Sequence, residues 1–226
     1  MHKQLKNKKG FSLIELVLAI AIIVMIGGVI AGICAAISNS FITTYDIDDS
    51  ADYAMLYARG FENSFLAYSQ AKNGAAGDTY KWNIANPKGT AGSVPTLTVT
   101  TGSGPQSVFD PQFIGSSDPS KSSKWAVSMF YKFDSSTSCV MYRIFIKDNY
   151  ATSHITRYDG SFWLPRFEQR AKFDDVEDSR EIDNSAGNKL NATTMEKIYG
   201  YKEPELDQLA SAWDEDYTDL ITYTWG

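Results

Sequence analysis

A long uncharged apolar segment near the N-terminus constrains this chain more than any other feature. No side chain from 16 to 45 carries a charge, and nearly every residue from 11 to 37 is apolar. Glu15 is the only charged residue in the second of these ranges. A helix needs about 20 apolar residues to cross the hydrocarbon core of a bilayer. The sequence therefore predicts a membrane-spanning helix within residues 11–45.

The charges on either side of this segment predict its orientation. The basic side chains among the first ten residues are Lys3, Lys6, Lys8 and Lys9. The acidic side chains that follow the segment most closely are Asp46, Asp48, Asp49 and Asp52. Because basic residues are retained on the cytoplasmic side of a membrane, we expect a single-pass protein with a cytoplasmic N-terminus and a C-terminal part outside.

The position of Gly10 distinguishes this N-terminus from a general secretory signal. Such a signal is cut at small residues that follow an apolar core of about 7 to 15 residues. Here Gly10 lies between the lysines and the apolar segment, so cleavage after it would remove residues 1–10 and leave the membrane helix on the mature protein.

The residues around this glycine resemble a known processing motif. The stretch in question is Lys8-Lys9-Gly10-Phe11-Ser12-Leu13-Ile14-Glu15-Leu16. It is similar to the prepilin cleavage and methylation motif of type IV pilins and of the related pseudopilins of secretion and DNA-uptake machines. The resemblance implies that prepilin peptidase, a membrane aspartyl protease, cuts after Gly10, that Phe11 becomes N-methylated, and that Glu15 guides subunit addition. It covers roughly the first fifty residues.

The position of Glu15 supports this interpretation on physical grounds. A carboxylate at the centre of a membrane helix costs about 2.5–3.5 kcal/mol to insert on translocon scales, so such residues are usually functional or paired. Cleavage after Gly10 would create a free amine on Phe11, and the Phe11 amine of a staggered neighbouring subunit is a suitable partner. The alternative is a carboxylate that reaches the water at the membrane edge.

Small residues interrupt the apolar segment at helical spacing. Gly28 and Gly32 are four residues apart, a pattern that forms a groove and lets membrane helices approach closely. Alternatively, these glycines are simply tolerated, or Gly27-Gly28 marks a place where the helix stretches, because each glycine costs about 1 kcal/mol of helix propensity.

Helical spacing continues beyond the uncharged segment. Steps of four and three residues separate Ile47, Ala51, Ala54, Ala58, Phe61, Phe65 and Tyr68. This apolar stripe predicts an amphipathic continuation of the helix over 46–77 that packs on a globular body. The helix would run from about Phe11 to Tyr68, with Asn73-Gly74 and Gly77 as stop signals. The aspartates over 46–52 lack the pattern of a calcium loop, which favours a solvated helix face over a metal site.

Residues 78–226 predict a body rich in antiparallel strands. Branched and aromatic residues favour strands over 79–84, 95–101, 124–133, 139–147 and 155–164. The polar residues 134–138 predict a hairpin, and Asp159-Gly160 predicts a second hairpin within the last range. Proline at position 204 predicts a helix from Glu203 through Trp213, with Leu206, Leu209, Ala210 and Trp213 on its buried face. The expected fold class is α+β, like that of type IV pilins: one long N-terminal helix packed on an antiparallel sheet.

The sequence offers little to an enzyme. His154 is the one histidine outside the first ten residues, and a lone histidine in a strand is a structural residue more often than part of a triad. We find no Walker loop, dinucleotide fingerprint or metal-ligand pattern, so we expect no catalytic residues, no cofactor and no metal. The acidic balance of 27 against 21 basic residues disfavours nucleic-acid binding through bulk charge. The acidic stretch 173–184 is interpreted as a solvated loop.

These features lead to one expected function and two alternatives. We expect a structural subunit of a type IV pilus or pilus-like filament, with copies of itself and related pilins, prepilin peptidase, the assembly machinery and, before assembly, membrane lipid as partners. The mature form would lie in an extracellular or cell-surface filament. One alternative is a minor pilin or pseudopilin of a secretion or DNA-uptake machine. The other is a membrane-tethered adhesive module that binds glycans through exposed tryptophans.

Overall fold

The computed structural model describes residues 13–70, 77–109, 123–150, 155–164 and 181–225. The chain forms two compact units, Met1–Asp46 and Ile47–Gly226. Helix α1, Leu13–Gln70, runs through both units. The predicted start of the helix, near Phe11, lies outside the described residues. At the other end, α1 extends two residues beyond the predicted end at Tyr68. The stop signal at Asn73-Gly74 also lies outside the described residues.

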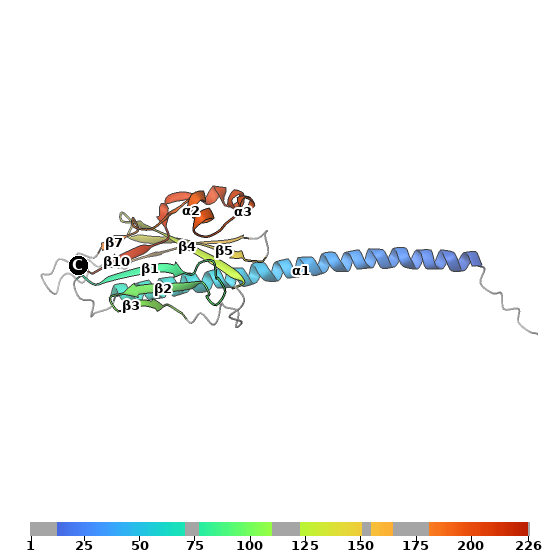
Figure 1. The fold of residues 1–226 in the computed structure, drawn as a ribbon, viewed down its shortest axis with the longest axis horizontal. Coiled ribbons are helices and arrows are strands. Elements are labelled where there is room, and N and C mark those ends of the chain that lie inside the picture. The colour runs from blue at the N-terminus through green and yellow to red at the C-terminus, as the bar shows by residue number, and fades with distance from the viewer. Residues whose placement is uncertain (1–12, 71–76, 110–122, 151–154, 165–180, 226) are drawn as a thin grey trace, which may run out of the picture. The chain divides into compact units, whose positions relative to one another are not determined.

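Among its described residues, the second unit forms two antiparallel sheets of five strands each, whose strands are seen in Figure 1. The strand order of the first sheet is β3-β2-β1-β10-β7. Its strands are β1 Thr79–Ala85, β2 Thr96–Thr101, β3 Gly104–Ser107, β7 Glu181–Asp183 and β10 Ile221–Thr224. The predicted strands over 79–84 and 95–101 are confirmed, whereas the sequence reasoning missed the other three.

The second sheet has the order β6-β5-β4-β9-β8. Its strands are β4 Trp125–Asp134, β5 Cys139–Asp148, β6 Ile155–Trp163, β8 Lys189–Leu190 and β9 Asp214–Thr218. The hairpin predicted around residues 134–138 is confirmed, because β4 and β5 pair along their whole length from Asp134 opposite Cys139 to Trp125 opposite Asp148. The sequence predicted a single antiparallel sheet, whereas the described residues form two.

The C-terminal part of α1 packs against the inner faces of both sheets. The stripe residues Ala54, Ala58, Phe61 and Phe65 are buried in one core with Trp82 and Leu97 of the first sheet and Tyr131, Tyr142 and Ile144 of the second. Ile47, at the N-terminal end of the stripe, is 37% exposed. Hydrogen bonds also tie the helix to the sheets: Trp82 Nε1 donates to Ser64 Oγ over 3.0 Å, and Tyr57 Oη donates to the Pro95 carbonyl over 2.9 Å.

A second, smaller core covers the opposite face of the β4–β5 sheet. Helices α2, Ala192–Lys197, and α3, Glu203–Gln208, lie over that face, away from α1 (Figure 1). Phe130, Phe145, Met195, Tyr199 and Leu209 are buried between them. The ammonium of Lys147 on β5 lies 2.8 Å from the carboxylate of Glu205 on α3, and both side chains are almost fully buried.

The hairpin turn predicted at Asp159-Gly160 is wrong. Asp159-Gly160 does not form a turn, since β6 continues through both residues and pairs with β5 along its length. Gly160 lies opposite Tyr142, and a Cβ at that position would collide with the tyrosine ring. The glycine therefore serves close cross-strand packing, which is the other common reason for a glycine inside a strand.

The predicted C-terminal helix is shorter than expected. Helix α3 ends at Gln208, a 3₁₀ turn follows over Ala210–Ala212, and β9 begins at Asp214. Leu209 is buried as predicted, but Ala210 is exposed and Ala212 is buried in its place. The change from helix to 3₁₀ turn rotates the chain, so that the helical spacing used for the prediction no longer applies.

Candidate functional site

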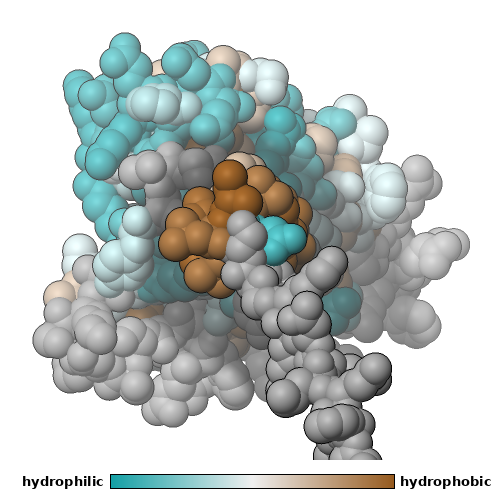
Figure 2. Space-filling model, turned by 90° about the vertical axis from the view of Figure 1, so that its right-hand side faces the viewer, coloured by the Kyte–Doolittle hydropathy of each residue, from teal (hydrophilic) through white to brown (hydrophobic). Residues whose placement is uncertain are grey.

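The N-terminal part of α1 is the most exposed apolar element that the structure describes. Residues Leu13–Ser38 have a mean hydropathy of 3.0, and no residue of the most apolar stretch among them is buried. Figure 2 looks toward the N-terminal end of the helix, where the visible surface is mostly brown, whereas the coloured surface around it is mostly teal or white. The segment is long and apolar enough to cross a membrane. Lipid or other helices must cover it, because water-exposed apolar surface of this extent marks an interaction site.

The structure describes one of the three residues predicted for processing and assembly. Glu15 lies in the first turn of α1, where it is exposed among apolar neighbours such as Ile14 and Leu16. A carboxylate in the first turn interacts favourably with the positive end of the helix dipole. Gly10 and Phe11 lie outside the described residues, so the expected cleavage and methylation there stay predictions.

Gly28 and Gly32 lie on an open face of α1. A Cβ added at either position would meet no atom within 4 Å, so no packing among the described residues requires a glycine at these two places. The spacing of four residues puts both in one row along the helix surface, the kind of row into which a second helix packs.

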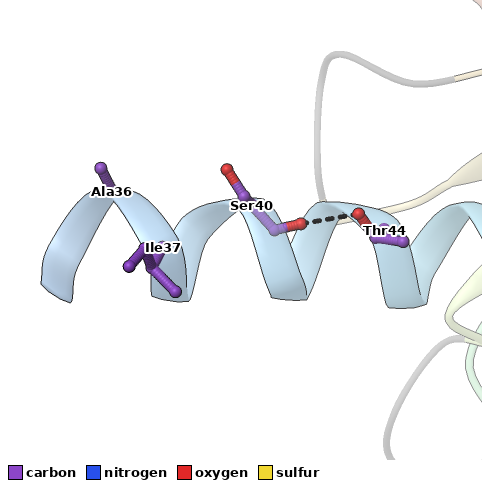
Figure 3. Close-up of a pocket in the computed structure, with 4 residues that line it drawn as sticks. All are labelled: Ala36, Ile37, Ser40 and Thr44. Atoms are coloured by element: carbon purple, nitrogen blue, oxygen red, sulfur yellow. Dashed lines mark hydrogen bonds between the residues drawn. The ribbon is translucent and has the colours of Figure 1, made fainter. Parts of the chain in front are cut away.

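The same row continues along α1 beyond Gly32. Ala36, Ser40 and Thr44 follow Gly32 at steps of four, and these three residues line a groove together with Ile37 (Figure 3). The Thr44 hydroxyl donates to the Ser40 carbonyl over 2.9 Å, so it needs no water and can be buried against a neighbour. The regular spacing is visible in the sequence, but the sequence-based prediction did not include the hydroxyl residues Ser40 and Thr44.

The other candidate residues do not form a site among the described parts of the chain. Asp48 and Asp52 are exposed on α1. The described ranges contain no group of three His, Cys, Asp or Glu side chains that could hold a metal ion. His154 and most of the acidic stretch 173–184 lie outside the described residues. Of the tryptophans considered for glycan binding, Trp82 and Trp125 are buried, whereas Trp163 on β6 is 69% exposed.

Together, the apolar helix and the two-sheet body define the class as an α+β protein whose N-terminal helix is long and apolar enough to be a membrane anchor. Residues 5–37 match the family model described as the prokaryotic N-terminal methylation motif. The N-terminal segment of the chain thus carries a methylation motif of the prepilin type, similar to that of type IV pilins and pseudopilins. No curated protein and no solved structure matches it.

Proposed function

We propose that this chain is a structural, non-catalytic subunit of a type IV pilus or pilus-like filament. Prepilin peptidase cuts the precursor after Gly10, Phe11 is N-methylated, and the mature subunit leaves the membrane when its N-terminal helix joins the helices of other subunits. The globular unit then faces the exterior of the filament and the cell.

The observation that carries this proposal is the exposed apolar half of α1. A membrane anchor alone needs apolar length, but it does not need a row of small residues. Here Gly28 and Gly32 have open space around them, and the row continues into Ala36, Ser40 and Thr44. Such a row lets a second helix approach closely, and in lipid this packing is a main source of helix association.

Glu15 supplies the electrostatic part of the proposal. In a filament core the carboxylate leaves water, and a buried charge without a partner costs several kcal/mol. The N-terminal amine of Phe11 in a neighbouring subunit neutralises it. The Glu15 carboxylate and the Phe11 amine belong to the same end of one chain, so they pair poorly within a single subunit. A neighbouring subunit that is displaced along the filament axis can bring its Phe11 amine to Glu15 more readily.

The decisive experiment separates assembly from insertion and cleavage. Glu15→Ala removes the charge that is costly in lipid, so membrane insertion should be maintained, and the basic leader and Gly10, which the peptidase is expected to recognise, are unchanged. The mature variant should therefore accumulate in the membrane and be absent from sheared filaments. Leu16→Ala, a change of similar size at the next exposed position, is the matched control and should still assemble.

Three measurements read out this experiment: intact mass for cleavage, membrane fractionation for insertion, and the sheared-filament fraction for assembly. A cleaved Glu15→Ala protein that enters filaments at the normal amount would contradict the role given to Glu15. Intact mass of the wild-type protein tests the processing step: it should correspond to a chain that begins with methylated Phe11. An uncut chain, or a cut near Ser38, would contradict the proposed function as a whole.

A further inference from the structure

A small polar pocket lies in the globular unit where the chain passes from one sheet to the other. Its lining comes from four segments: Asn83 and Ile84 on β1, Ala186–Asn188 between β7 and β8, Tyr199 after α2, and Asp219 with Leu220 between β9 and β10. The β7–β8 and β9–β10 connections, which both pass between the two sheets, thus contribute to it. The pocket volume is about 220 Å³, below the usual range of about 300–1,000 Å³ for drug-sized ligands.

Asp219 is the charged side chain of this pocket, and its carboxylate is held in place. Its Oδ1 accepts from the Asn188 backbone N–H over 2.7 Å, and its Oδ2 accepts from Asn188 Nδ2 and Tyr199 Oη, each over 2.9 Å. A carboxylate offers about four acceptor positions, so one remains for a ligand. The arrangement is preorganised, because no side chain has to move to present that acceptor.

Donor and acceptor groups surround this acceptor. Asn83 Oδ1 accepts from Thr98 Oγ1 over 2.8 Å, which orients the amide and leaves its Nδ2 without a partner among the described residues. Asn188 Nδ2 donates to Asp219, so its Oδ1 remains an acceptor on the exposed rim. Burial, and then the charge of Asp219, raise the pKa of Tyr199, so the phenol keeps its proton and stays a donor.

A further buried hydroxyl belongs to the same neighbourhood. The Tyr131 side chain is fully buried, and its Oη has no hydrogen-bond partner among the described residues. Burial, and then the charge of Asp219, raise the pKa of Tyr131. A buried hydroxyl without a partner is costly, but Tyr131 is not one of the residues that line the pocket.

These groups favour a neutral ligand with several hydroxyls. Asp219 would repel an anion, and a metal ion needs more free lone pairs than a carboxylate with three bound donors retains. A hydroxyl both donates and accepts, so adjacent hydroxyls can pair with Asp219 and with the Asn83 amide. We propose that this pocket binds a single sugar ring of hexose size.

This inference is independent of filament assembly, because none of the pocket residues belongs to α1. The test uses the full-length protein in a detergent without a sugar headgroup, and saturation-transfer NMR with glucose, galactose, mannose and N-acetylglucosamine, each alone. The blocking variant is Ala186→Trp, at an exposed position on the pocket rim. Its matched control is Ser185→Trp, which adds the same side chain at the adjacent exposed residue outside the lining.

We expect saturation transfer from the wild-type protein and from Ser185→Trp to at least one of the four sugars. Ala186→Trp should weaken this binding at least about tenfold, the equivalent of 1.4 kcal/mol. Near-UV circular dichroism of both variants establishes that the fold is retained. Absence of transfer to all four sugars, or transfer that Ala186→Trp leaves unchanged, would overturn the proposal.

Discussion

Phe61 is the residue on which the packing of α1 against both sheets depends most directly. Its side chain is fully buried. The ring contacts Trp82 of the first sheet at a centroid distance of 6.4 Å, and Tyr131 and Tyr142 of the second sheet at 4.7 and 5.7 Å. Replacing Phe61 with Ala therefore opens a cavity at the point where the helix and the two sheets meet.

The expected cost follows from this environment. Truncation of a buried Phe to Ala usually lowers the free energy of unfolding by about 3–5 kcal/mol. Edge and tilted aromatic pairs add about 0.5–1.5 kcal/mol beyond area burial, and rigid neighbours from two sheets limit collapse of the cavity. We therefore expect a loss near the upper end, about 4–5 kcal/mol. Phe61→Leu keeps most of the volume and should cost less than half as much.

Urea unfolding of the fragment 47–226, followed by tryptophan fluorescence, measures these changes. We expect the fragment itself to be a folded, soluble monomer, since it corresponds to one compact unit. Met55→Ala on the same helix is the control, because Met55 is 37% exposed and should cost about 1 kcal/mol or less. A loss of less than about 1 kcal/mol for Phe61→Ala would show that this face of α1 is not packed on the sheets in solution.

Three further predictions concern the globular unit. Gly160→Ala should lower the free energy of unfolding by about 1–3 kcal/mol, because the added Cβ collides with the facing tyrosine of β5. In the control Gly102→Ala the added Cβ meets nothing within 4 Å, so the free energy of unfolding should change by about 0.5 kcal/mol or less. Equal losses in the two variants would contradict this prediction. Glu205→Gln should cost about 3–5 kcal/mol by leaving the Lys147 charge buried, and adding Lys147→Met should recover most of the loss in the same urea assay. Burial raises the pKa of Tyr131 above its ordinary 10.0, so the folded state keeps a proton that the unfolded chain loses. The free energy of unfolding should therefore be constant just below pH 10 and fall above it, with tyrosinate absorbance rising together with unfolding; ionisation that precedes unfolding would contradict it.

The strands that the sequence predicted correctly are long and rich in branched and aromatic residues. β4 and β5 are ten residues each and are buried along most of their length, so composition alone identifies them. The missed strands have five residues or fewer, and two of them are largely polar: β7 is Glu-Ile-Asp, and β9 begins Asp-Glu-Asp. Such segments become strands because a neighbouring strand offers hydrogen bonds, and that information is absent from the local sequence.

The pocket at Asp219 could not be predicted for a similar reason. Its residues lie at positions 83–84, 186–188, 199 and 219–220, and no motif connects them. The β7–β8 and β9–β10 connections, which pass between the two sheets, help to bring them together, and the sequence reasoning expected a single sheet. Predicting the pocket would have required the pairing of β10 with β1 and of β9 with β4, which are contacts between distant parts of the chain.

The sequence by itself determined the main features of the N-terminal segment. The motif from Lys8 to Leu16, the uncharged segment and the row that begins at Gly28 are local patterns, and a helix in lipid satisfies its own backbone hydrogen bonds without tertiary partners. Only the tertiary structure decided the division into two sheets, the straight course of β6 through Gly160 and the grouping of polar residues around Asp219. Those features arise from non-local strand pairing and from the packing of side chains such as Tyr142, which no short stretch of sequence encodes.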